Sequence, residues 1–247
     1  MSLIYFVRHG ESIGNQLLID NLSDDENILS DNGRLQANNL GIHLQNVTFT
    51  HVFSSPYIRA ISTAQHILSA SKTVYSDDAI VVDPDIRERN MGIYEQKPVT
   101  ELVKALMKAG DDYIDWTPEG AESKLDVELR LEPFLQKIGI IVDSGLERKT
   151  ILVVTHCALM VHLWHYLLRC DQKYRFKNWK PEFMKVSKNA SYFLLTMDKL
   201  QDDVQPRDLE VVVAHGSDHL KSLEQDAFSS CAHRDETLDS GKSCMQQ

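Results

Sequence analysis

Short apolar runs that alternate with helical patterns constrain the fold of this 247-residue chain more than any other feature of its sequence. Residues 3–7 form a short, continuous run that favours a strand, as expected when both faces of the strand are buried. Residues 151–155 are strongly β-branched, and a helical pattern follows them at once and extends to about Leu168. This order predicts an α/β fold, a three-layer sandwich whose mainly parallel central sheet carries helices on both faces.

The rest of the chain continues this alternation up to about residue 222. Further helices are predicted over residues 30–45, 56–68, 98–108 and 122–142, and short strands over residues 51–54 and 80–82. Two later runs, 192–196 and 209–213, are predicted to form an antiparallel pair at an edge of the sheet. From about residue 223 the sequence is rich in Ser, Asp and Glu and lacks periodicity. We therefore predict one domain over residues 1–222, followed by a disordered acidic tail over residues 223–247.

The charge and the cysteine content exclude several classes of function. The net charge is −10, so an extended nucleic-acid interface is not expected. The most apolar long stretch, 151–168, contains three histidines, which makes it a poor membrane span. The N-terminal run lacks the basic segment of a signal peptide, and the four cysteines lack the CxxC spacing of zinc sites. We expect a cytoplasmic protein without a metal, another cofactor, or a membrane or nucleic-acid partner, and its oligomeric state stays open.

Polar side chains suited to catalysis follow the predicted strands. Arg8 and His9 come directly after the first strand, and Arg59 comes soon after the second. Glu88 follows the third strand by a short loop, and His156 directly follows the β-branched strand. In an open parallel sheet, ligands bind beyond the carboxyl ends of the strands. Residues that are far apart in the sequence are therefore expected to meet at one edge of the sheet and to form one site.

This set of residues suits phosphoryl transfer. Arg8 and Arg59 carry permanent charges on planar donor groups that match phosphate oxygens, and Asn15 adds a neutral donor. A neutral His9 has a lone pair that can attack phosphorus, provided that cations stabilise the charge on the phosphoryl oxygens. The leaving alkoxide needs a proton, and Glu88 is the nearest candidate acid, which requires a partly desolvated position. The same carboxylate would then act as a base on the water that cleaves the phosphohistidine.

Five motifs, in chain order, resemble those of the histidine phosphatase (phosphoglycerate mutase-like) superfamily. They are Arg8-His9-Gly10-Glu11-Ser12 with Asn15, residues 54–60 with Thr63-Ala64, residues 86–92, residues 120–123 and residues 153–156. The resemblance implies that His9 is the phosphorylated nucleophile and that Glu88 is the acid and base. It also implies that the phosphate pocket is completed by Arg8, Arg59 and His156, and that the substrate is contacted by Asn15.

Within this superfamily the chain most resembles the TIGAR-like fructose-2,6-bisphosphatases. This likeness is carried by residues 46–55, residues 87–89, residues 158–160 and residues 218–220. It implies a metal-independent phosphoric monoester hydrolase acting on a small phosphorylated metabolite, with fructose 2,6-bisphosphate as the first candidate. The alternatives are a phosphoglycerate mutase, a broad-specificity phosphatase and, from another class, a catalytically silent member that binds phosphorylated ligands or protein partners.

Two departures from the superfamily pattern bear on substrate choice. Cys157 stands where Gly usually follows the second histidine, and a thiol at a helix N-terminus is a candidate for a reactive thiolate. Gln96 stands where Gly is common. Three other roles stay open: Arg87 and Arg89 are either phosphate contacts or solvated charges, and Asn15 either contacts substrate or caps a turn.

Overall fold

Strand β1 (Ser2–Arg8) lies at the centre of the sheet, and both of its faces are covered, as its sequence predicts. The computed structural model describes residues 1–200, 206–221 and 223, and its sheet has the strand order β3-β2-β4-β1-β6-β7-β5. The other strands are β2 (His51–Ser54), β3 (Ile80–Val82), β4 (Thr150–Thr155), β5 (Tyr174–Phe176), β6 (Tyr192–Met197) and β7 (Arg207–Gly216). Strands β3, β2, β4 and β1 pair in parallel, whereas β6 is antiparallel to both β1 and β7.

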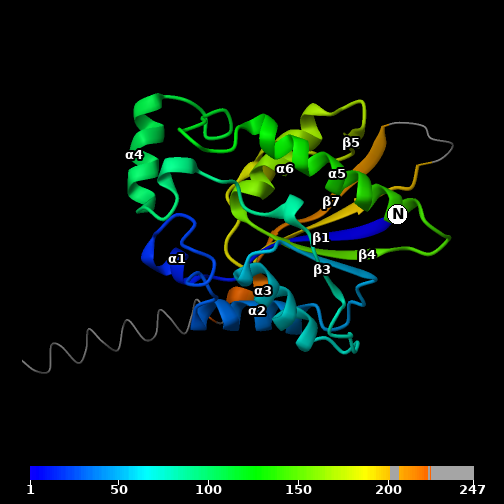
Figure 1. Cartoon of the computed structure of the whole chain (residues 1–247). Coiled ribbons are helices and arrows are strands. Elements are labelled where there is room, and N and C mark those ends of the chain that lie inside the picture. The colour runs from blue at the N-terminus through cyan, green and yellow to red at the C-terminus, as the bar shows by residue number, and fades with distance from the viewer. Residues whose placement is uncertain (201–205, 222, 224–247) are drawn as a thin grey trace, which may run out of the picture.

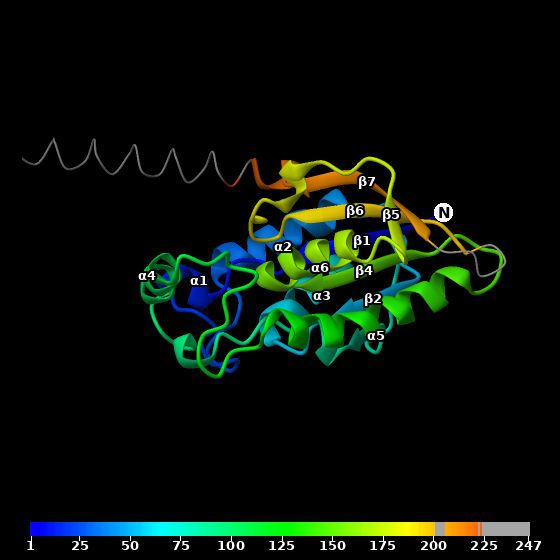
Figure 2. The ribbon, with the colours of Figure 1, turned by 90° about the horizontal axis from the view of Figure 1, so that it is seen from above.

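Helices cover both faces of this sheet, which confirms the predicted three-layer α/β sandwich (Figures 1 and 2). The α-helices are α1 (Ile13–Leu17), α2 (Asp31–His43), α3 (Ile58–Ser69), α4 (Val99–Ala109), α5 (Lys124–Asp143) and α6 (Cys157–Arg169). Short 3₁₀ helices are η1 (Pro84–Ile86), η2 (Gly92–Tyr94), η3 (Pro181–Met184) and η4 (Asp218–Leu220). Alternate residues of β1 enter opposite cores, because Ile4 and Phe6 pack with α5 and α6 while Tyr5 and Val7 pack with α2 and α3.

The helix boundaries follow local capping signals. Ser30 accepts a hydrogen bond from the backbone N–H of Gly33 and so begins α2. Ser123 and Asp126 form a reciprocal capping box at the start of α5. Gly110 ends α4 in the left-handed conformation, with φ of +73°.

Two short elements were not predicted. Helix α1 has five residues, too few for a helical period, and β5 is Tyr-Arg-Phe, which lacks the β-branched run that marks the equally short β3. The antiparallel pairing of β6 and β7 is confirmed, but the edge strand is β5, which pairs in parallel with β7. The predicted edge strand at 209–213 therefore lies one position inside the sheet.

The parallel strands all end on the side of the molecule where α1 and α4 lie (Figure 1). The side chains that follow β1, β2 and β4 are thereby brought to one edge of the sheet. Within the described part of the chain, no helix is both long enough and apolar enough to cross a membrane. The predicted acidic tail, apart from residue 223, lies outside the described residues.

Candidate active site

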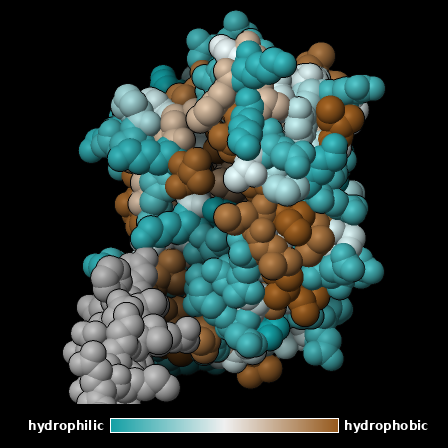
Figure 3. Space-filling view, turned by 90° about the vertical axis from the view of Figure 1, so that its left-hand side faces the viewer, coloured by the Kyte–Doolittle hydropathy of each residue, from teal (hydrophilic) through white to brown (hydrophobic). Residues whose placement is uncertain are grey.

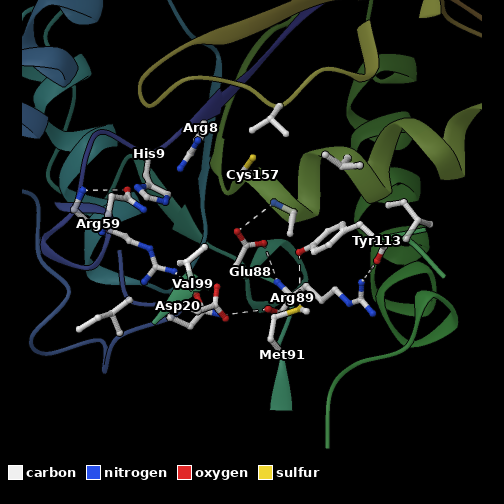
Figure 4. A pocket seen from close by; sticks show the side chains of 18 of the residues that line it. Arg8, His9, Asp20, Arg59, Glu88, Arg89, Met91, Val99, Tyr113 and Cys157 are labelled. Carbon is white, nitrogen blue, oxygen red and sulfur yellow. Dashed lines mark hydrogen bonds between the residues drawn. The ribbon is translucent and has the colours of Figure 1, made fainter. Parts of the chain in front are cut away.

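A cavity of about 470 Å³ lies at the carboxyl ends of the parallel strands. Five of the six predicted site residues line it, namely Arg8, His9, Asn15, Arg59 and Glu88. Figure 3 shows this side of the molecule, where hydrophilic and apolar side chains surround a hollow. The sixth residue, His156, is fully buried and packs against His9, with the two ring centroids 5.1 Å apart. The structure thus brings the predicted residues together (Figure 4).

The orientation of the His9 ring determines which of its nitrogens is free. Nδ1 lies 2.7 Å from the carbonyl oxygen of Gly10. A carbonyl oxygen only accepts hydrogen bonds, so Nδ1 carries the hydrogen and Nε2 keeps its lone pair. Burial, followed by the charges of Arg59 and Arg8, holds the pKa of His9 well below its usual range. His9 is therefore neutral at neutral pH, with Nε2 available as a nucleophile.

Close packing behind Gly10 fixes the loop that carries His9. A Cβ at this position would lie 2.5 Å from the carbonyl oxygen of Gly33 in α2, so only glycine fits. The backbone N–H of Gly10 donates to Oγ1 of Thr63 in α3, at 3.0 Å. The backbone N–H of His9 donates to the carbonyl oxygen of Thr155 at the end of β4, at 2.9 Å. Strand ends and two helices together hold the imidazole in place.

His156 is held by a hydroxyl group. Its Nε2 lies 2.6 Å from Oγ of Ser55, and the same Oγ accepts the backbone N–H of Tyr57 at 3.4 Å. Ser55 engages Nε2 of His156, and a Ser55 hydroxyl that donates to Nε2 would place the ring hydrogen on Nδ1. Nδ1 is buried and has no hydrogen-bond partner among the described residues. Burial, with Arg59 as the next cause, holds the pKa of His156 well below its usual range, so this ring is also neutral.

The two arginines leave donors open toward the cavity. Nη1 of Arg8 donates to the carbonyl oxygen of Ser187 at 2.6 Å, while its buried Nε has no partner among the described residues. Arg59 is 3% exposed, and its Nη2 donates to Oδ1 of Asn21 at 3.1 Å. Burial lowers the pKa of Arg59, but a guanidinium remains charged at any physiological pH. An anion at this end of the cavity would meet the charges of both Arg8 and Arg59.

Glu88 is half-buried and is oriented by three backbone N–H groups. Oε1 accepts from Arg89 at 2.9 Å and from Leu159 at 3.0 Å, and Oε2 accepts from Ala158 at 3.2 Å. Ala158 and Leu159 belong to the first turn of α6, where backbone donors are otherwise unpaired. The carboxyl group of Glu88, which follows η1, is therefore held against the start of α6 at the wall of the cavity (Figure 4).

Asn15 caps a turn, which was one of the two roles left open by the sequence. Its backbone N–H and side-chain Oδ1 form a capping box with Ser12 at the start of α1. Oδ1 also accepts from the side chain of Asn189 at 2.9 Å. Asn15 nevertheless lines the cavity. With Oδ1 already paired, the atom that remains for a ligand is Nδ2.

The interpretation of Arg89 as a solvated charge is wrong. Its guanidinium is fully buried and donates to the backbone carbonyl oxygens of Glu122 at 2.9 Å, Tyr113 at 3.0 Å and Trp116 at 2.5 Å. Nη1 also lies 3.3 Å from Nε2 of His162, so four of the five N–H donors of Arg89 are engaged and the side chain holds the segment between α4 and α5 together. Arg87 forms an ion pair with Glu122 at 2.5 Å.

The expectation of a reactive thiolate at Cys157 is also wrong. Burial raises the pKa of the Cys157 thiol, and this effect outweighs the nearby charge of Arg8. Within residues 1–200, 206–221 and 223, no three His, Cys, Asp or Glu side chains are grouped so that they could hold a metal ion.

Several residues of the site escaped the sequence analysis. Ser55 and Thr63 lay inside quoted motifs, but their hydrogen bonds to His156 and Gly10 depend on tertiary contacts. Asp20 and Tyr113 line the cavity without any sequence signal, because they come from segments outside the predicted strand ends.

A family model for the histidine phosphatase superfamily (branch 1) matches residues 4–216. The chain belongs to the histidine phosphatase superfamily. This assignment agrees with the motifs around His9, Arg59, Glu88 and His156 and with the arrangement of these residues at the sheet edge.

The relatives that this chain matches carry the names of different enzymes. The chain is 41% identical over 131 residues to the fructose-2,6-bisphosphatase TIGAR of Xenopus tropicalis, covering 53% of this chain and 47% of that one. It is 35% identical over 103 residues to a probable phosphoglycerate mutase GpmB of Erwinia tasmaniensis, covering 41% and 45%. The chain thus spans about half the length of the curated relatives it matches. The phosphoglycerate mutase structure from Bacillus anthracis matches 89% of this chain and 95% of its own with a TM-score of 0.70 and 23% identity, and shows a shared fold.

Proposed function

We propose that this histidine phosphatase is a phosphoric monoester hydrolase that transfers a phosphoryl group from a small metabolite first to His9 and then to water. The observation that carries the proposal is a buried, neutral imidazole whose Nε2 lone pair is free, beside two arginines. A neutral nitrogen nucleophile next to fixed cations is what attack on a phosphate ester requires.

In the first step Nε2 of His9 attacks phosphorus, and the bond between phosphorus and the ester oxygen breaks. Arg8, Arg59 and Nδ1–H of His156 hold the phosphoryl oxygens and stabilise their charge. The leaving alkoxide takes a proton from Glu88. Oε1 of Glu88 already accepts two backbone N–H groups and Oε2 only one, so Oε2 is the oxygen that carries this proton.

In the second step Glu88, now a carboxylate, removes a proton from a water molecule that attacks the phosphohistidine. The bond between phosphorus and Nε2 breaks, inorganic phosphate is released, and His9 returns to its neutral form. Asn15 donates Nδ2–H to the bound substrate during both steps.

The names of the TIGAR relatives make fructose 2,6-bisphosphate, cleaved at its 2-phosphate, the finer proposal for the substrate. The composition of the cavity supports a second candidate, a broad-specificity monoester phosphatase. Among the described residues that line the cavity, the arginines are Arg8, Arg59 and Arg89, and four of the five N–H donors of Arg89 are already engaged by backbone carbonyls and by His162. A second phosphate, or the carboxylate of a phosphoglycerate, would therefore lie near the mouth of the cavity without an arginine of its own.

The test combines phosphate release with detection of the intermediate. Purified protein is incubated with fructose 2,6-bisphosphate, fructose 2-phosphate and phenyl phosphate, and rapidly quenched samples are analysed for phosphohistidine by mass spectrometry. We expect phosphate release from each ester and phosphate on His9. His9→Ala abolishes both, whereas His66→Ala, on α3 and outside the cavity wall, retains both. Normal ligand binding without any release would instead indicate the catalytically silent class.

A further inference from the structure

Asp20 occupies a rigid position on the cavity wall, although the proposed reaction has no use for it. Its backbone N–H donates to the carbonyl oxygen of Lys97 at 2.8 Å, and its carbonyl oxygen accepts from the N–H of Gln96 at 2.7 Å. The segment after α1 is thereby tied to the segment before α4. Figure 4 shows Asp20 on the wall of the cavity together with Arg59 and Glu88.

The carboxyl group of Asp20 is unpaired, in contrast to its neighbours. Its Oδ2 is buried and has no hydrogen-bond partner among the described residues. Nearby polar groups are already used, since Oε1 of Glu95 accepts from Asn21 and Met91 and Arg59 donates to Asn21. Buried polar atoms are nearly always satisfied by protein, water or ligand. Because Asp20 lines the cavity beside Arg59 and Glu88, its unsatisfied carboxyl group lies next to the place where the alcohol part of a phosphate ester would lie.

The charges around Asp20 restrict what it can bind. Burial, followed by the charges of Glu95 and Glu88, raises the pKa of Asp20 to about 7, while the charge of Arg59 opposes this shift. Tyr113 also lies close enough to interact with Asp20 and is neutral, because burial raises its own pKa. Both the acid and the carboxylate form of Asp20 are therefore populated near neutral pH. A hydroxyl group can serve both forms, as donor to the carboxylate or acceptor from the acid, whereas an ammonium group can serve only one.

We propose that Asp20 binds a hydroxyl group on the alcohol part of the substrate, so that the enzyme prefers phosphate esters of polyols over those of plain alcohols. This inference rests on the proposed phosphatase function. Other walls of the cavity present apolar side chains from Ile19, Met91 and Val99. A few polar groups among apolar walls fix the orientation of a ligand, and Asp20 is one of these groups here.

The experiment compares two esters with the same carbon skeleton, glycerol 2-phosphate and isopropyl phosphate. A hydrogen bond to a charged partner is worth about 10- to 100-fold in kcat/KM, so the wild type should prefer glycerol 2-phosphate by about this factor. Asp20→Asn should lower that ratio about tenfold, and Asp20→Ser should do the same if Asp20→Asn folds poorly. The matched control is Asp25→Asn, an exposed aspartate in the same segment, which should keep the wild-type ratio.

The pH dependence of the ratio separates a binding role from a structural one. Because the carboxylate accepts a stronger hydrogen bond than the neutral acid, the wild-type ratio should rise as the pH increases through about 7 and stay flat in Asp20→Asn. An unchanged ratio in both Asp20 variants would overturn the inference while leaving the phosphatase intact. A wild-type preference for phosphoethanolamine that Asp20→Asn removes would also overturn it, in favour of an ammonium ligand. If neither ester is cleaved and no phosphohistidine forms, the proposed function fails and this inference fails with it.

Discussion

The two ends of the cavity are built in different ways. At the inner end, Arg8, His9 and His156 lie at the ends of β1 and β4, and Arg59 lies in the first turn of α3. The outer wall is formed by Asp20 and by side chains from short helices and connecting segments, such as Met91, Val99 and Tyr113. Regular elements thus position the groups that react with phosphorus, and irregular segments position the groups that meet the rest of the substrate. The expected division is that inner residues control the rate and outer residues control selectivity and stability.

The largest effect is expected at the inner end, from Arg59→Gln. The guanidinium is 3% exposed and stabilises charge that develops in the transition state, so kcat/KM for phenyl phosphate should fall about 10³-fold. Arg59→Lys should recover only part of this loss, because an ammonium group cannot form the two parallel hydrogen bonds of a guanidinium. Arg34→Gln, a half-exposed arginine on α2, serves as the control and should retain full activity. A loss below tenfold in Arg59→Gln would contradict the assignment of the phosphate end.

The second prediction tests whether the hydrogen bonds of Arg89 stabilise the outer wall of the cavity. Arg89→Met leaves three buried carbonyl oxygens without donors, so the free energy of unfolding should fall by about 3 to 5 kcal/mol. Urea denaturation measures this loss, and Arg89→Lys should restore little of it because one ammonium cannot reach three separated carbonyls. The more exposed Arg87→Met should cost about 1 kcal/mol or less. Equal losses in the two variants would mean that the buried network is not what holds the segment.

Protonation should distinguish the two ends by the sign of its effect on stability. Burial lowers the pKa values of His9, His156 and His162, so the unfolded chain binds protons below about pH 6.5 that the folded chain does not. Stability due to these histidines is therefore lost as the pH falls. Asp20, whose pKa is raised to about 7, acts in the opposite direction, because its folded form binds the proton first. From pH 7 to pH 5 the net free energy of unfolding should fall by about 3 to 4 kcal/mol, and Asp20→Asn should show a steeper fall in urea titrations.

The inner end could be predicted from the sequence because its residues directly follow strands that have a clear pattern. His9 and His156 each come immediately after a buried parallel strand, and parallel strands end at the same edge of a sheet. The family model and the shared fold confirm the superfamily and the α/β sandwich that this reasoning predicted. Which nitrogen of His9 is free could not be predicted, because it depends on the position of the Gly10 carbonyl.

The outer wall could not be predicted, and the reasons are physical. The pKa of Asp20 depends on burial and on Glu95 and Glu88, which are more than sixty residues away in the sequence. In the sequence, Arg89 resembles any other charged residue of a polar turn. Its burial depends on the segment between α4 and α5, whose carbonyl oxygens accept its hydrogen bonds. Helix α1 is too short for its hydrophobic period to appear, and strand β5 lacks a β-branched run. Selectivity therefore depends on the parts of the chain where the sequence carries the weakest structural signal.

The smallest predicted effect concerns the backbone conformation of Gln96, next to the outer wall of the cavity. Gln96 adopts a φ of +61°, a left-handed conformation that costs a residue with a Cβ about 1 to 2 kcal/mol, and its N–H holds the carbonyl oxygen of Asp20. Gln96→Gly removes that strain but adds chain entropy to the unfolded state, so a net gain of about 0.5 to 1 kcal/mol is expected. Thermal unfolding should show a Tm higher by roughly 1 to 4 °C. Gln96→Ala keeps the Cβ and should leave the Tm unchanged, so a similar rise in both variants would point to loss of the glutamine side chain as the cause. The hydrogen bond from Gln96 to Asp20 comes from the backbone, so Gln96→Gly should keep the preference for glycerol 2-phosphate. A variant with a higher Tm and an unchanged preference would show that positioning of Asp20 does not depend on the backbone strain at residue 96.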